Sequence, residues 1–133
     1  MSKRIYLIDD DPIFVFLIRK VIEAIDAAAG IEVFPDGELA ISRIAGLLDE
    51  PALMPDLIFL DLNMPVLDGW GFLDQYSEIR GGFPKTVVLY IISSTITPAE
   101  IERAGEFPFI SGLIIKPPDK GRIEEILTGS ATR

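Results

Sequence analysis

Three carboxylates at the ends of two short apolar runs are the residues of this sequence best suited to chemistry. Asp9 and Asp10 directly follow the apolar residues 5–8, and Asp61 lies near the end of the apolar residues 57–62. Apolar runs of this length are typical of buried parallel strands. Open α/β sheets gather their chemistry at the carboxyl ends of such strands. Two strands that deliver carboxylates to one edge predict a metal-dependent site.

The elements that must position these carboxylates follow from the alternation of apolar runs with helical patterns. Alternating strands and helices predict an α/β fold, with a doubly wound five-stranded parallel sheet and helices on both faces. Right-handed crossovers then place all strand ends at one edge. Side chains suited to capping mark the helix starts. The expected strands are residues 4–8, 31–34, 57–62, 86–92 and 112–115, and the expected helices follow Asp11, Asp36, Asp68, Thr97 and Asp119.

Two further strand ends contribute polar groups to the same edge. Ser93 and Ser94 follow the fourth run, and Lys116 follows the fifth. Neighbouring residues of a strand point to opposite faces, so only one of the two serines can serve the site. The distance to the next helical pattern favours Ser93, with Ser94 as the alternative. A lysine at a strand end that faces carboxylates has an obvious ionic partner.

Length and composition bound the class of protein. The 133 residues suit one domain, expected to occupy residues 1–133 with its core at about 4–127, and 49% of them are hydrophobic, which excludes intrinsic disorder. The formal net charge is −9, from 12 basic and 21 acidic side chains. This balance argues against nucleic-acid binding, which depends on Lys and Arg to neutralise phosphates. We therefore expect protein partners rather than DNA or RNA.

Two residue types are missing from the sequence. The absence of cysteine excludes disulfides, zinc–thiolate sites and thiol catalysis. The absence of histidine excludes Ser-His-Asp chemistry and a phosphohistidine carrier within these residues. No apolar run approaches the roughly 20 residues of a membrane helix, and the acidic residues 9–11 end the first run too early for a signal peptide. We therefore expect a cytoplasmic protein without membrane association.

Four motifs, taken in order, resemble the receiver domain of two-component response regulators. Each lies at the end of an expected strand, and the resemblance extends over roughly residues 4–127. It implies the flavodoxin-like receiver fold, built from five β/α units. The motifs are Leu7-Ile8-Asp9-Asp10-Asp11-Pro12, Leu60-Asp61-Leu62-Asn63-Met64-Pro65 with Asp68-Gly69, Ile92-Ser93-Ser94, and Lys116-Pro117.

The resemblance implies that Asp61 accepts a phosphoryl group from a phosphohistidine on a histidine kinase or a histidine phosphotransfer protein. A Mg²⁺ (or Mn²⁺) ion would be held by Asp10, Asp61 and the backbone carbonyl of Asn63, with Asp9 acting through water. The residue types agree with this implication, because a carboxylate is a competent nucleophile and Mg²⁺ prefers hard oxygen ligands. Catalysis of phosphoryl transfer consists mainly of positioning and neutralisation of oxygen charge.

The resemblance also assigns roles to the other groups at this edge. Ser93 would be the switch hydroxyl that hydrogen-bonds a phosphoryl oxygen. Lys116 would pair with Asp61 first and with the phosphoryl oxygens afterwards. A cis peptide bond between Lys116 and Pro117 is implied by the family alone, because X-Pro bonds are ordinarily trans.

Three interpretations of function follow. The leading one is a single-domain response regulator that signals through phosphorylation-dependent contact with a downstream protein, as a monomer or weak homodimer. The second is a pseudo-receiver that binds partners without phosphorylation, against which the intact set of polar residues argues. The third is an aspartyl-nucleophile phosphatase, which is disfavoured because Asn63 stands where such enzymes carry an acid/base aspartate. The only chemistry expected is therefore the protein's own phosphorylation and dephosphorylation.

Several residues near the motifs are expected to serve the fold or to depart from the family. Leu113 stands where the family often has a Tyr or Phe whose inward and outward rotamers are coupled to the switch hydroxyl. This aromatic switch therefore cannot operate at this position. The loop of residues 49–55 is longer than in compact receivers, and no output domain follows within these residues. Asp11 is expected to be a helix cap, Gly69 and Gly71 to give backbone freedom, and Phe14, Phe16 and Phe72 to be core or partly covered surface, while Trp70 is left open.

Overall fold

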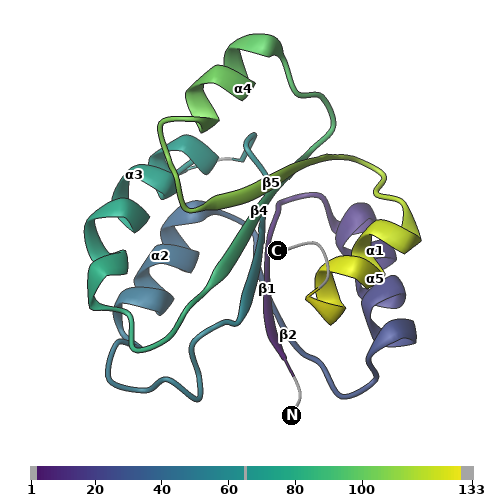
Figure 1. The fold of residues 1–133 in the computed structure, drawn as a ribbon, viewed down its shortest axis with the longest axis horizontal. Helices are drawn as coiled ribbons and strands as arrows, with labels where there is room; N and C mark the ends of the chain where they lie inside the picture. Colours follow the sequence, from purple (N-terminus) through teal and green to yellow (C-terminus); the bar gives the residue numbers. More distant parts are fainter. Residues whose placement is uncertain (1–2, 65, 130–133) are drawn as a thin grey trace.

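Five parallel strands and five α-helices alternate along the described residues, which are 3–64 and 66–129 of the computed structural model (Figure 1). The strands form one sheet in the order β2-β1-β3-β4-β5, which confirms the predicted doubly wound α/β fold. No helix within these ranges is both long and apolar enough to cross a bilayer. In chain order the elements are β1 (Arg4–Ile8), α1 (Pro12–Ile25), β2 (Gly30–Phe34), α2 (Gly37–Ala45), β3 (Leu57–Leu60), α3 (Gly69–Ile79), the 3₁₀ turn η1 (Arg80–Gly82), β4 (Val88–Ser93), α4 (Pro98–Ala104), β5 (Ile110–Ile115) and α5 (Lys120–Thr128).

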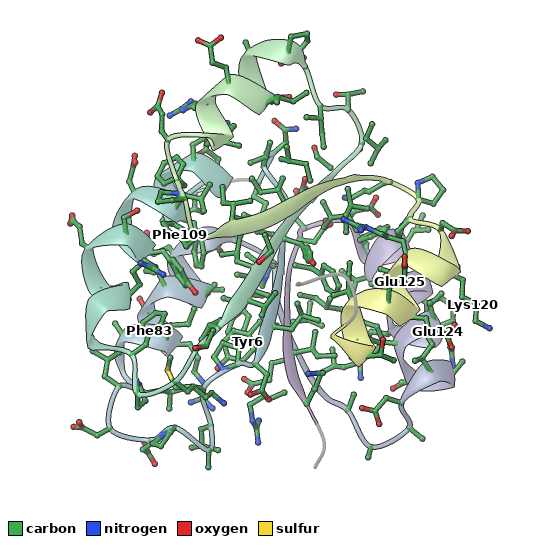
Figure 2. The ribbon with its side chains drawn as sticks, viewed as in Figure 1. Tyr6, Phe83, Phe109, Lys120, Glu124 and Glu125 are labelled. Carbon is green, nitrogen blue, oxygen red and sulfur yellow. The ribbon has the colours of Figure 1, made fainter. Side chains whose placement is uncertain are left out.

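The sheet separates two apolar cores, because neighbouring residues of each strand point to opposite faces. In β1, Tyr6 and Ile8 belong to the core covered by α2, α3 and α4, whereas Ile5 and Leu7 belong to the core covered by α1 and α5. Figure 1 shows these helix layers on the two sides of the sheet. In Figure 2, Phe83 and Phe109 lie on the α3 side of the sheet, and Glu124 and Glu125 lie at α5 on the opposite side.

Side chains at the helix N-termini fix where most helices begin. Asp11 accepts hydrogen bonds from two backbone N–H groups of the first turn of α1, which confirms the predicted cap. Thr97 and Glu100 form the predicted capping box of α4. The expectation for Asp119 was wrong in part: it occupies the cap position of α5, but its side chain makes no capping hydrogen bond within the described part of the chain. Its backbone carbonyl accepts the N–H groups of the first turn instead.

The strand ends differ from the predicted ranges because hydrogen-bond partners, and not only side-chain types, set their limits. β3 ends at Leu60 and not at residue 62 as predicted. Its pairing with β4 also ends at Leu60, which is opposite Ile91. β5 begins at Ile110, two residues earlier than predicted, because a register shift extends its pairing with β4. β4 reaches Ser93, which pairs with Ile115. Asp61 therefore directly follows β3, and Ser93 is the last residue of β4.

Gly69 allows the first turn of α3 to approach the end of β3 closely. Its N–H donates to the carbonyl oxygen of Leu62 at 3.0 Å. A Cβ at this position would lie 2.6 Å from the carbonyl oxygen of Asp61 and 2.7 Å from the Cα of Leu62. The sequence predicts backbone freedom here, but the structure gives a steric reason, because a side chain would press on the backbone that carries Asp61.

Val66, in the loop between β3 and α3, adopts a backbone conformation that β-branched residues rarely occupy. Its φ angle is 65°, in the left-handed region, and its side chain is 78% exposed. Such conformations cost about 1–3 kcal/mol and persist where the surrounding structure holds them. The loop is held at its far end by Asp68, which caps α3, and by the Gly69 contact.

We expect Gly69→Ala to lower the free energy of unfolding by about 1–3 kcal/mol, because the added methyl group overpacks the contact between α3 and the end of β3. Urea unfolding followed by circular dichroism measures this loss. Gly81→Ala is the matched control, since a Cβ at Gly81 has no neighbour within 4 Å and should change stability by less than about 0.5 kcal/mol. Equal effects of the two substitutions would contradict the steric role of Gly69.

Candidate functional site

The three predicted carboxylates lie together at the carboxyl edge of the sheet. One carboxylate oxygen each from Asp9, Asp10 and Asp61 can be chosen so that all lie within 4.8 Å of one another. Asp9 and Asp61 are buried, with 3% and 5% of their surface exposed, whereas Asp10 is exposed. Asp61 is fixed by its backbone N–H, which donates to the carbonyl oxygen of Ile8 at 2.9 Å and so extends the sheet by one residue.

Lys116 joins this cluster from the end of β5. Its Nζ lies 2.7 Å from Oδ2 of Asp9 and 3.7 Å from Oδ2 of Asp61, and its side chain is only 10% exposed. The pair predicted between Lys116 and Asp61 is present, but Asp9 is the nearer partner. The backbone N–H of Lys116 donates to the carbonyl oxygen of Ser93 at 2.8 Å, which ties the lysine to β4. The peptide bond between Lys116 and Pro117 is cis, as the resemblance implies.

Asp9 and Asp10 differ in how far their carboxylates are already engaged. Oδ1 of Asp9 accepts the backbone N–H of Asp11 at 2.9 Å, and Oδ2 contacts the lysine ammonium. Asp10 is exposed beside this buried pair. Asn63 lies past the end of β3, and its N–H makes a long contact of 3.5 Å with Oδ1 of Asp61. The arrangement leaves Asp10 as the most accessible carboxylate of the cluster.

Burial, as the largest cause, and the carboxylate of Asp9 together raise the pKa of Asp61 to about 6, against the opposing effect of Lys116. The pKa of Asp9 is also raised by burial, against the effect of Lys116. Three carboxylates and one ammonium group leave two negative charges uncompensated when all four are ionised. Carboxylate oxygens with this charge excess are a donor set that fits Mg²⁺ or Mn²⁺.

The two serines at the end of β4 have different surroundings. Ser93 is fully buried, and among the described residues its Oγ has no hydrogen-bond partner. Ser94 is exposed. A buried hydroxyl without a partner costs free energy, and each such group calls for an explanation. The environment of Ser93 is that of a hydroxyl available to an incoming polar group, which supports choosing it over Ser94.

The other aromatic residues considered in the sequence differ in their burial. Phe72 is fully buried, and Phe16 is 60% exposed on α1. Trp70, left open by the sequence, is 9% exposed and stacks on Phe107, with the guanidinium group of Arg103 at 4.5 Å from its ring, so it links α3 to α4.

Phe14 is the site residue that the sequence did not reveal. It is predicted as core or partly covered surface, and it is indeed buried. Its ring centroid also lies 4.4 Å from Nζ of Lys116. The available signal was its place in the first turn of α1, directly after the acidic residues 9–11.

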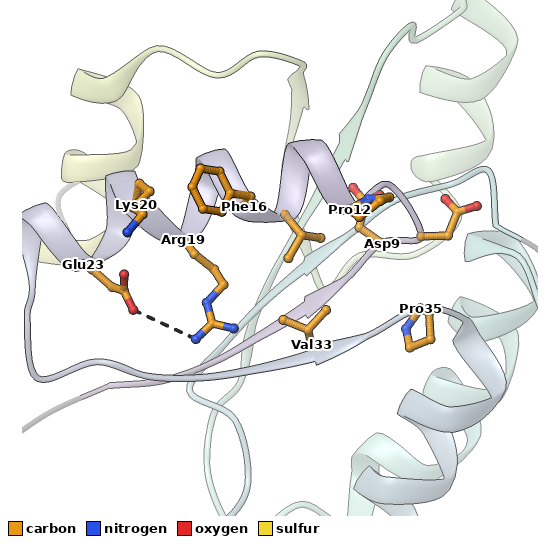
Figure 3. Close-up of a pocket in the computed structure, with 10 residues that line it drawn as sticks. Asp9, Pro12, Phe16, Arg19, Lys20, Glu23, Val33 and Pro35 are labelled. Atoms are coloured by element: carbon orange, nitrogen blue, oxygen red, sulfur yellow. Dashed lines mark ion pairs between the residues drawn. The ribbon is translucent and has the colours of Figure 1, made fainter.

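A groove of about 620 Å³ runs from the acidic cluster along α1 and the edge strand β2 (Figure 3). Asp9 and Asp10 line it beside Pro12, at the start of α1. Figure 3 shows Arg19 and Glu23, an ion pair with a 4.0 Å separation, farther along the helix. The groove is therefore continuous with two of the three carboxylates of the cluster.

The sequence matches the family model described as "Response regulator receiver domain" over residues 5–128. It is 34% identical over 125 residues to protein-glutamate methylesterase/protein-glutamine glutaminase 3 of Geobacter sulfurreducens, covering 94% of this chain but 30% of that protein. It is 28% identical to two-component response regulator ORR41 of Oryza sativa subsp. japonica, covering 93% of this chain and 91% of the rice protein. The chain thus spans about a third or less of the methylesterases that it resembles.

The fold matches solved structures across the whole chain. A two-component response regulator from Cytophaga hutchinsonii superposes with a TM-score of 0.84 at 23% sequence identity, covering 98% of both chains. At this identity the similarity establishes the arrangement of strands and helices. The likeness to the methylesterases is confined to a part of those proteins, so their enzyme activity is not carried to this chain.

We expect Asp61→Asn to stabilise the metal-free protein at pH 8 by up to about 3 kcal/mol, because it removes a buried charge whose pKa is raised from 3.8 to about 6. Between these two values the native protein retains a proton that the unfolded chain releases, so the stability of the wild type falls as pH rises through this window. Below about pH 4 the advantage of the variant should disappear. Urea unfolding in EDTA at pH 4 and pH 8 measures both limits.

Asp56→Asn provides the control of opposite sign. Burial raises the pKa of Asp56, but the N–H of Arg4 and the ammonium group of Lys85 outweigh that effect and lower it overall. The charged form therefore stabilises the fold above the unfolded pKa, and its removal should cost more at pH 8 than at low pH. A pH-independent effect of Asp61→Asn, or the same sign for both variants, would contradict the electrostatic account.

Proposed function

Because the chain belongs to the response regulator receiver domain family, whose model it matches over residues 5–128, we propose that it is a phosphoryl acceptor in a histidine-to-aspartate phosphorelay. The phosphoryl donor is the phosphohistidine of a histidine kinase or a histidine phosphotransfer protein, and Asp61 is the acceptor. The observation that carries the proposal is the grouping of Asp61 with two other carboxylates and Lys116 at an accessible edge of the sheet.

Asp61 is suited to act as the nucleophile. With its pKa at about 6, the carboxylate is mostly ionised near pH 7, and one of its oxygens attacks phosphorus. The bond from phosphorus to the histidine nitrogen breaks, the imidazole leaves with the electron pair, and an aspartyl phosphate forms. The pathway needs the donor, phosphorus and Asp61 in line, and little further chemistry from the protein.

The neighbouring groups stabilise charge on the phosphoryl oxygens. The ammonium group of Lys116, 3.7 Å from Oδ2 of Asp61, is close enough to pair with a phosphoryl oxygen after a small movement. The hydroxyl group of Ser93 would donate a hydrogen bond that it otherwise lacks. Asp10, Asp61 and the carbonyl of Asn63 would hold Mg²⁺ or Mn²⁺, with Asp9 acting through water. When bound, the ion supplies positive charge that offsets the charge of the transferred group.

Phosphorylation would pass the signal to a downstream protein by changing the surface around the strand ends. The added charge draws Lys116 and Ser93 toward the phosphoryl group; Ser93 ends β4 and Lys116 directly follows β5, the strands before and after α4 in the chain. Ile101 on α4 and Ile115 at the end of β5 are more than half exposed and would contact the target. Leu113 carries no aromatic ring, so the change would be transmitted by the backbone and aliphatic packing.

The donor would dock on the exposed apolar surface of α1. Ile13 and Leu17 are 73% and 54% exposed, one helical turn apart, directly after the acidic cluster. Apolar side chains so exposed next to a reactive group mark an interaction surface. The negative charge of the chain suits protein partners in preference to nucleic acid.

We expect radiolabelled acetyl phosphate with Mg²⁺ to label the wild-type protein and Asp61→Asn to take no label, because the nucleophile is lost. Asp56→Asn removes a carboxylate elsewhere in the chain and should leave labelling intact. EDTA should abolish labelling of the wild type. Label on Asp61→Asn would refute the assignment of Asp61, and an unlabelled wild type would favour a binding module that works without phosphorylation. Repeated turnover of a phosphomonoester would instead indicate a phosphatase.

We expect Ile13→Ser to slow phosphoryl transfer from a donor protein by about tenfold or more, because an exposed isoleucine buried in a complex contributes roughly 1.5–3 kcal/mol. Labelling by acetyl phosphate should not change, since this small donor needs no docking surface. Ile101→Ser is the control, because Ile101 is also more than half exposed but lies on α4. Equal slowing with both donors would show that Ile13 acts on the site itself.

A further inference from the structure

Among the described residues, the ammonium group of Lys116 contacts two carboxylates and one uncharged side chain, that of Phe14. The ring centroid lies 4.4 Å from Nζ, compared with 2.7 Å for Oδ2 of Asp9 and 3.7 Å for Oδ2 of Asp61. The ring is 8% exposed, and the lysine side chain is 10% exposed. A cation at this distance from an aromatic ring is attracted by the ring's electron-rich face, most strongly where water is excluded.

The ring is fixed in place by its own element. The backbone N–H of Phe14 donates to Oδ1 of Asp11 at 3.2 Å, and the N–H of Asp11 donates to Oδ1 of Asp9 at 2.9 Å. The side chain packs in the core covered by α1 and α5, with Ile92 and Ile114 among its members. The cap of α1 therefore sets the ring and the Asp9 carboxylate in one rigid turn, and both contact the same ammonium group.

We propose that Phe14 is a positioning residue, which holds the ammonium group of Lys116 within reach of Asp61 through the face of its ring. The proposal rests on the function given above. Asp9, with its Oδ2 2.7 Å from Nζ, binds the ammonium group as an ion pair and competes with the phosphoryl oxygens for it. The ring attracts the cation without forming a competing salt bridge, and it leaves less room for water around Nζ. The lysine is thereby kept available for the group that Asp61 receives.

Helix α1 also carries a lysine–phenylalanine contact that is exposed to solvent, and this contact can be compared with the buried one. Nζ of Lys20 lies 5.4 Å from the ring centroid of Phe16, but Phe16 is 60% exposed. Cation–π contacts at exposed sites are weak because water solvates the cation. Phe16 therefore offers a matched control, because it is a phenylalanine of the same helix as Phe14 and also faces a lysine.

The test replaces Phe14 with mono-, di- and trifluorophenylalanine, which keep the shape of the ring and withdraw electrons from its face. The rate constant of labelling by acetyl phosphate at saturating Mg²⁺ should fall stepwise, by about three- to tenfold for the trifluorinated ring. The upfield ring-current shift of the Lys116 ε-methylene protons, measured by NMR without phosphodonor, reports whether the contact exists in solution. The same series at Phe16 should leave the rate unchanged.

The outcomes separate this proposal from the function on which it rests. A stepwise fall at Phe14 alone supports positioning through the ring face, because a residue that merely filled space would tolerate fluorine. A rate indifferent to fluorination at Phe14, or an absent ring-current shift, overturns the role of Phe14 and leaves Asp61 as the acceptor. A wild-type protein that takes no label overturns both.

Discussion

Lys116 places one ammonium group against two buried carboxylates, and the rest of the site is built around this imbalance of charge. Burial alone would favour protonated carboxylates, and the pKa of Asp61 accordingly rises to about 6. One lysine cannot neutralise Asp9, Asp10 and Asp61 together. The folded chain therefore maintains a place where added positive charge is stabilising. Under the proposed function, a phosphoryl group would meet there a nucleophile and a counter-cation that are already in place.

The scaffold maintains this arrangement through strand ends and not through long loops. Each charged group follows or ends a strand whose hydrogen bonds fix its backbone, as the N–H of Asp61 to Ile8 and the N–H of Lys116 to Ser93 show. The close approach of α3 at Gly69 prevents the end of β3 from shifting. This restraint explains how carboxylates that repel one another remain close together, because the backbone hydrogen bonds between neighbouring strands oppose their separation.

Much of this arrangement is predictable from the sequence, because apolar runs show where buried strands end and parallel topology brings those ends together. The prediction fails where a choice depends on distances of an ångström. Nothing in the residue order shows that Lys116 lies closer to Asp9 than to Asp61, or that a glycine in α3 faces the backbone that directly follows β3. Phe14 illustrates the same limit: periodicity marks it as apolar, but only packing reveals which cation its ring touches.

Trp70 is a natural fluorescent probe of the helix layer formed by α3 and α4. It is the single tryptophan of the sequence, and its indole ring is stacked on Phe107 and faces Arg103 of α4. A displacement of α4 relative to α3 removes an aromatic neighbour and a charge at once, which changes the polarity around the ring. The layer of α1 and α5 contains no such chromophore. A structural change confined to the α1 side of the sheet would thus leave the tryptophan emission unchanged, whereas a change that also moves α4 would alter it.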